Sequence, residues 1–116
     1  MYSVEIKKES LPYSTKLNIV DNIFNLSFNY NLYDERVYCT LSDVDDNILA
    51  EDEPIVLGQI LFARYYIDDA GNFKETFPKA VIIPNFIDSA NVGQILYNNI
   101  NEAVLYVEEN IWDTHS

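Results

Sequence analysis

The chain offers few residues for nucleophilic catalysis. It contains one histidine, His115, which stands next to the last residue, and one cysteine, Cys39. A Ser/His/Asp or Cys/His arrangement needs a histidine held in place by its surroundings, whereas chain ends usually fray. Cys39 alternates in step with Val37 and Leu41, which predicts a small buried side chain and not a reactive thiolate. We therefore expect that the protein is not an enzyme.

Metal-ligating residues are present, but their spacing does not fit a site. Asp43, Asp45 and Asn47 have the first three ligand spacings of a calcium-binding loop. Ile48 and Pro54 stand where that loop needs glycine and glutamate. One cysteine and one histidine cannot supply the four ligands of a zinc site. The sequence predicts neither a metal nor a cofactor.

Acidic residues are concentrated between Asp34 and Glu53. This segment holds eight of them against one basic residue, Arg36, within a chain of net charge −12. So acidic a chain would repel a nucleic acid. The pattern predicts a negative patch on connecting loops, which serves either solubility or attraction to a basic partner. The candidate partner-binding residues in this patch are Asp43, Asp45, Asp46, Glu51, Asp52 and Glu53.

The single tryptophan, Trp112, is a further candidate for partner binding. It lies in a short C-terminal tail, residues 109–116. Burial of so large an apolar side chain is strongly favourable, and buried tryptophans are typical anchors of interfaces. We expect Trp112 to pack either on an exposed edge of its own sheet or on a neighbouring subunit; a disordered tail is the alternative.

Length and composition indicate one globular domain. The chain has 116 residues, of which 48% are apolar, and it can bury a core without disulfides or metals. We expect a single β-rich domain over residues 1–108, followed by the tail. No apolar run approaches the roughly 18 residues of a membrane span, so no membrane association is expected. The polar start of the chain favours synthesis in the cytoplasm.

The clearest periodic pattern runs from Ile23 to Tyr33. Apolar and polar residues alternate there, which predicts a β-strand with one buried face; the apolar positions are Phe24, Leu26, Phe28, Tyr30 and Leu32. A short polar connection follows, and the alternation resumes from Val37 to Leu41. Two antiparallel strands joined as a hairpin are the natural interpretation.

Several shorter segments complete a β-rich pattern. Alternation predicts strands over Tyr2–Lys7 and Leu17–Val20, and a β-rich run covers Ala103–Val107. The segment Ile55–Ile67 fits a strand or a short helix, and its last three residues favour a strand. Ala80–Ile83 is typical of a short buried or edge strand that ends at Pro84. Together these segments predict an all-β fold, a small antiparallel β-sandwich or barrel, with at most one short helix, around Val92–Asn99.

The order of these features resembles the small baseplate plug proteins of contractile-tailed bacteriophages, over about residues 1–108. The resemblance rests on hydrophobic patterning and turn positions in Tyr2–Lys7, Pro12–Tyr13, Leu17–Val20, Ile23–Tyr33, Val37–Asp43, Leu57–Gly58, Gly93–Leu96 and Val104–Val107. It implies a late, non-enzymatic structural protein of the virion, in the tail baseplate. Such a protein would pack beside the hub or tail tube, in several copies, against other tail or baseplate proteins, and help to close the tail end.

Two other functions fit the composition. A small domain of charge −12 could mimic DNA and inhibit a basic nuclease. The chain has nine tyrosines, and a β-sandwich that exposes some of them could bind a small ligand or a carbohydrate.

Overall fold

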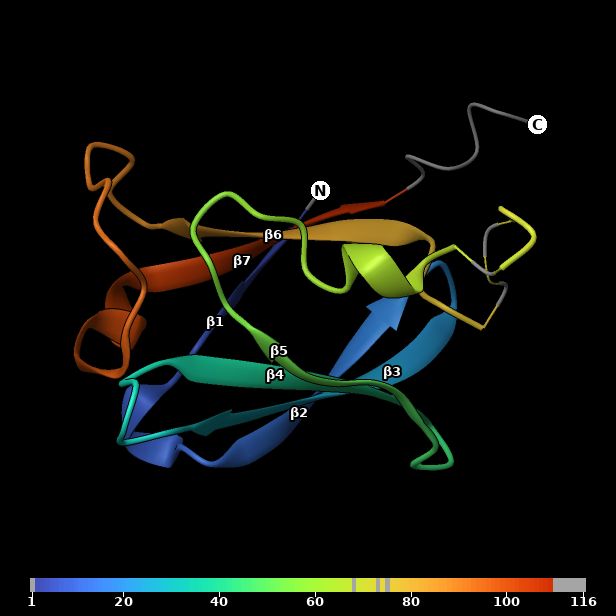
Figure 1. Ribbon diagram of the computed structural model, residues 1–116, viewed down its shortest axis with the longest axis horizontal. Helices are drawn as coiled ribbons and strands as arrows, with labels where there is room; N and C mark the ends of the chain where they lie inside the picture. Colours follow the sequence, from blue (N-terminus) through green and yellow to red (C-terminus); the bar gives the residue numbers. More distant parts are fainter. Residues whose placement is uncertain (1, 68, 73, 75, 110–116) are drawn as a thin grey trace.

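Seven β-strands form two antiparallel sheets in residues 2–67, 69–72, 74 and 76–109, the part of the chain that the computed structural model describes (Figure 1). The larger sheet has the order β2-β3-β4-β5, and the smaller one the order β1-β7-β6. This confirms the predicted all-β fold. Of the two architectures that the sequence allowed, the separate sheets correspond to the sandwich.

The larger sheet is a meander of neighbouring hairpins. Its strands are β2 (Tyr13–Ile19), β3 (Asn22–Tyr30), β4 (Val37–Asp43) and β5 (Ile48–Pro54). The alternation that predicted β3 and β4 is borne out, because the inward residues Leu26 and Phe28 pair with Leu41 and Cys39 and are at most 1% exposed. β3 ends at Tyr30, so Leu32, expected on the buried face, lies in a turn and is 75% exposed.

The smaller sheet brings the two ends of the described chain together. Its central strand, β7 (Ala103–Glu109), pairs with β1 (Tyr2–Glu5) on one side and with β6 (Ala80–Phe86) on the other. The first five residues of β7 are apolar and are buried or half-buried, so both faces of this strand are largely shielded from solvent. β7 continues to Glu109, the first residue of the expected tail.

The inward faces of both sheets share one hydrophobic core. Phe24, Leu26 and Phe28 from the larger sheet belong to the same cluster of buried side chains as Ile82 and Leu105 from the smaller one. Figure 1 shows the two sheets stacked as layers, with the loops at their ends. Burial of this apolar area is the main favourable contribution to the stability of the fold.

The segment expected to form a strand over Ile55–Ile67 is a loop, and that prediction was wrong. The strand lies just before it, as β5, while the loop contains one turn of 3-10 helix, η2 (Ala63–Tyr65). The loop is apolar because it buries Ile55, Leu61 and Phe62 in the core. Its first turn needs the positive φ of Gly58 (+76°).

Pro84 does not end β6, contrary to the expectation. β6 pairs with β7 on one side only, and on its other edge the carbonyls of Ile82 and Pro84 accept bonds from Leu61 N (2.8 Å) and Gly58 N (2.9 Å). A proline is tolerated at such an edge because it has no N–H to leave unpaired. The 55–62 loop therefore covers the edge of the smaller sheet.

The helical segments are short. Besides η2, the described residues contain η1 (Lys8–Ser10) and η3 (Tyr97–Glu102), both 3-10 helices. The short helix expected around Val92–Asn99 corresponds to η3, which begins later. In the described part of the chain, no helix has the length and apolar character needed to cross a membrane.

Candidate functional site

The acidic residues that the sequence grouped together do not form one patch. Since β3 and β4 are antiparallel, the β2–β3 and β4–β5 turns lie at one end of the larger sheet and the β3–β4 loop at the other. The nine residues of β3 separate these ends by about 27 Å. Asp43, Asp45 and Asp46 lie at the first end, whereas Asp34 and Glu35 lie at the second.

The expectation that these acids stand on connecting loops was also wrong for several of them. Asp43 is the last residue of β4, and Glu51, Asp52 and Glu53 belong to β5. The sequence did not reveal β5 because apolar and polar residues do not alternate along it. β5 is the edge strand of its sheet and pairs irregularly with β4, so its buried positions do not follow a period of two.

Asp43 shapes the β4–β5 turn. Its Oδ1 accepts bonds from the backbone N of Asp45 and of Asn47, both at 2.9 Å, and its Oδ2 accepts one from Asn47 Nδ2 at 3.0 Å. These bonds, the Asn47 side chain first, lower the pKa of the Asp43 carboxyl below its ordinary value. Asp43 is thus a turn-forming residue, whose carboxylate is already engaged within its own chain.

Apolar side chains are exposed beside this acidic turn. Val44 and Ile48 are each 59% exposed, and Ile23 from the start of β3 is 45% exposed. Asp45 and Asp46 lie between Val44 and Ile48 in the sequence and are exposed as well. We call this group the turn end, defined as Ile23, Asp43, Val44, Asp45, Asp46 and Ile48. An apolar centre with a charged rim is the usual composition of a protein interface.

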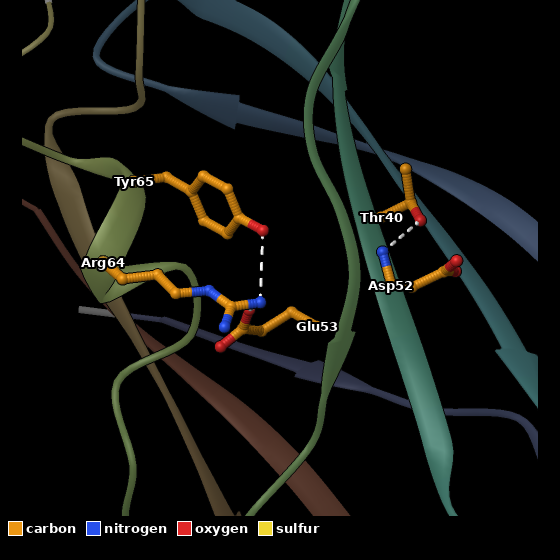
Figure 2. Close-up of polar contacts among 5 residues, drawn as sticks. All are labelled: Thr40, Asp52, Glu53, Arg64 and Tyr65. Atoms are coloured by element: carbon orange, nitrogen blue, oxygen red, sulfur yellow. Dashed lines mark hydrogen bonds and ion pairs between the residues drawn. The ribbon is translucent and has the colours of Figure 1, made fainter.

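The acids of β5 point in different directions. At a bulge in β5, Asp52 adopts a positive φ of 51°, and its N donates to Thr40 Oγ1 at 3.0 Å. Glu53 turns to the other side, where its Oε2 lies 3.2 Å from Arg64 Nη2. Figure 2 shows the Asp52 and Glu53 side chains on opposite sides of the strand. The two do not act on one partner surface.

The contact between Glu53 and Arg64 is an ion pair without a well-aligned hydrogen bond. Glu53 Oε2 is out of contact with solvent, and its geometry with Arg64 Nη2 does not meet that of a hydrogen bond. Arg64 instead donates to Tyr65 Oη at 3.1 Å and lies over the same ring (Figure 2). The pair attaches η2 to β5, because Arg64 reaches from one to the other.

Of the residues that the structure describes, Cys39 is the candidate for nucleophilic chemistry and the acidic side chains are the candidates for metal binding. Cys39 is fully buried, and burial, with the nearby Glu53 charge, raises the pKa of its thiol. Among the described residues, no group of three or more His, Cys, Asp or Glu side chains is placed to hold a metal ion. His115 and Trp112 lie outside the described residues.

The sequence missed the β3–β4 loop as a candidate site. Leu32 and Tyr33 stand at its tip, 75% and 101% exposed. Leu32 continues the apolar alternation of β3, which is why the expected strand ran as far as Tyr33. Asn31 and Asp34 beside them are turn formers, and they were the available sign that the strand stops.

The chain matches a known protein family. The family described as "Cyanophage baseplate Pam3 plug gp18" matches residues 1–109, which include all seven strands. Comparison with curated proteins gives no match.

Proposed function

The chain belongs to the family of the cyanophage baseplate Pam3 plug gp18, and on that premise we propose that it packs beside the hub or tail tube and helps to close the tail end. It is a structural subunit of a phage tail baseplate, where it contacts other baseplate proteins. The finer position is our proposal. The observation that carries it is the family match, which extends from β1 to the last residue of β7.

We further propose that the subunit has no catalytic activity and occurs in several copies per particle. Its family is a structural one, and its one cysteine is buried with a raised thiol pKa. It would be synthesised in the host cytoplasm and then incorporated into the growing tail, without cofactor, membrane or nucleic acid.

The turn end is the proposed contact with a basic neighbour. Its exposed Val44 and Ile48 supply apolar area, while Asp45 and Asp46 supply negative charge at the rim. Rim charges of this kind steer encounter and set orientation more than they add affinity. Glu51, Asp52 and Glu53 lie away from this surface along β5, and Trp112 in the tail is proposed as a separate anchor.

Quantitative mass spectrometry of purified virions and of isolated tails tests the proposal. We expect the chain at a fixed ratio to the other baseplate proteins, retained in tails after the heads are removed. Tails assembled without it should show an open tube end in electron micrographs. A phage protein of similar cellular abundance that is not part of the virion is the control.

The outcome that contradicts the proposal is a chain abundant in infected cells and absent from tails. That result would favour the acidic inhibitor of a nuclease, which acts in the cytoplasm.

A further inference from the structure

Two adjacent apolar side chains project from the β3–β4 loop, residues 31–36. Tyr33 is 101% exposed and Leu32 is 75% exposed, and of the large apolar side chains described Val92, at 83%, is the other one above 60%. A single exposed leucine is ordinary on a protein surface. A leucine and a tyrosine side by side at the tip of one loop are unusual. Whether they form a ready binding surface depends on whether the loop is held in one conformation.

The loop is held in one conformation by its own hydrogen bonds. Glu35 N donates to Asn31 O at 2.8 Å, and Asn31 N donates to Arg36 O at 3.0 Å. The side chain of Asn31 accepts from Tyr33 N at 2.8 Å, and the side chain of Asp34 accepts from Arg36 N at 2.9 Å. Polar groups of the loop are thus bonded to each other, while Leu32 and Tyr33 are directed outward.

The loop is also attached to its surroundings on both sides. Tyr38 in β4 donates its hydroxyl to Asp34 Oδ2, and Tyr97 N in η3 donates to Glu35 O at 2.7 Å. The ring of Tyr97 stacks on Tyr30, with the ring centroids 4.4 Å apart. Because the loop is ordered in the free chain, a partner would not have to order it, and this saves entropy on binding.

Three acidic residues lie near the two apolar side chains, against one basic residue of the loop, Arg36. Tyr30, Leu32, Tyr33 and Tyr38 line one shallow hollow together with Asp52, and Asp34 and Glu35 follow in the loop. The hydrogen bond from Tyr38 lowers the pKa of Asp34 below its ordinary value. We call this region the hairpin end, defined as Leu32, Tyr33, Asp34, Glu35, Tyr38 and Asp52.

We propose that the hairpin end inserts Leu32 and Tyr33 into an apolar pocket rimmed by lysine or arginine on a different baseplate protein. Tyrosine is enriched among the residues that dominate binding energy, and an acidic rim is complementary to a basic one. A second copy of this chain is a poor occupant, because each copy carries a net charge of −12. That the partner is a baseplate protein rests on the proposed function.

The hairpin end and the turn end lie at opposite ends of the larger sheet. The chain would therefore contact one neighbour at each end of the larger sheet, as expected of a subunit that lies between two others.

Competition during assembly tests the inference. Host cells that express a marked variant are infected with the unaltered phage, and the ratio of variant to unaltered chain is measured by mass spectrometry in cells and in virions. We expect the variant carrying Leu32→Ala and Tyr33→Ala to be depleted from virions roughly thirtyfold, the factor of a strong interface residue. Tyr33→Phe should enter normally, since the ring fills the pocket.

The matched control is Ile67→Ala, which removes an exposed apolar side chain (47% exposed) from another segment. It should enter virions in proportion to its amount in the cell. The purified variants should keep the thermal midpoint of the unaltered protein, because Leu32 and Tyr33 are outside the core. Each single substitution serves in place of the double variant if the latter unfolds.

The outcomes separate this inference from the proposed function. If the marked control chain never enters virions, the proposed function fails. If the control and the double variant enter equally, the inference is overturned while the proposed function stands. The variant carrying Glu35→Gln and Asp52→Asn should also enter virions less than the unaltered chain. Its full incorporation would overturn the proposal that the partner's pocket has a basic rim. Self-association of the unaltered protein in sedimentation, lost in the double variant, would make the occupant a second copy and overturn the inference.

Discussion

Among single residues, Asp43 is the one whose role differs most between sequence and structure. Its position in the acidic segment indicated a contact with a partner. Its carboxylate instead accepts three hydrogen bonds from Asp45 and Asn47 within the β4–β5 turn. The neighbouring Asp45 and Asp46, which are exposed, are left to face a partner.

Replacing Asp43 by Asn should destabilise the protein at pH 7. The folded pKa of Asp43 lies below its unfolded value of about 3.9, so its stabilising effect is complete above that pH and is lost as the pH falls through the folded pKa. Urea unfolding should therefore show a difference between the two proteins at pH 7 that shrinks at pH values below about 4.

The matched control is Asp45→Asn, which removes the same charge from an exposed position of the turn. Equal losses in the two variants would mean that net charge, and not the turn, is responsible.

Cys39 should behave as an apolar side chain and not as a thiol. Its raised pKa and complete burial keep it protonated and out of reach of solvent. A thiol reagent at pH 8 should leave the folded protein unmodified over hours and react with one thiol per chain after unfolding in urea. Rapid reaction of the folded protein would show that β4 is oriented differently.

At the scale of elements, β3 carries the centre of the core. Phe28 is 1% exposed, pairs with Cys39 across the sheet, and its ring lies 5.3 Å from that of Tyr13. Phe28→Ala should cost about 3–5 kcal/mol in the free energy of unfolding, through lost burial and the cavity left behind. Chemical denaturation measures this cost.

Asn29→Ala provides the comparison, because Asn29 is the exposed neighbour on the same strand. It should change stability by no more than about 0.5 kcal/mol. If the costs of the two substitutions were reversed, β3 would be shifted by one residue, which exchanges its two faces.

At the scale of the whole molecule, the two ends of the larger sheet are the proposed contacts with other baseplate proteins. Neutralising the turn end by Asp45→Asn and Asp46→Asn should slow association with tails that lack the chain and weaken its salt dependence. Asp43 stays unaltered so that the turn is kept. Association rates measured at several salt concentrations check this expectation.

Glu5→Gln with Glu102→Gln changes the net charge by the same amount at exposed positions in β1 and η3. This control should bind tails at nearly the original rate. Equal slowing in both variants would assign the effect to overall charge and return the acidic turn to a role in solubility.

Deleting residues 110–116 tests the expected packing of Trp112. Reduced stability of the isolated subunit is expected if the tryptophan packs on its own sheet, and unchanged stability with failed assembly if it docks on a neighbour. Thermal unfolding and incorporation into virions measure the two effects. Full stability together with normal assembly would contradict both forms of the prediction.

The sequence by itself determined the fold class and the central strands. The alternation in β3 and β4 is a local property, since neighbouring side chains of a strand point to opposite faces wherever one face is buried. Leu26, Phe28, Cys39 and Leu41 could therefore be assigned to the core from their spacing. The order of such segments also indicated the family, which depends on patterning along the chain.

Tertiary structure alone decided the features that depend on contacts between distant segments. The 55–62 loop is apolar because it covers the core and the edge of β6, and Pro84 is tolerated in β6 because it faces that loop. The acidic residues were divided between two ends by the antiparallel pairing of β3 with β4. Leu32 and Tyr33 are exposed because the hydrogen bonds that the Asn31 and Asp34 side chains accept form a turn, and β3 ends before it. Local periodicity carries no information about which segment covers an edge or where a hairpin turns, since both are fixed by long-range packing.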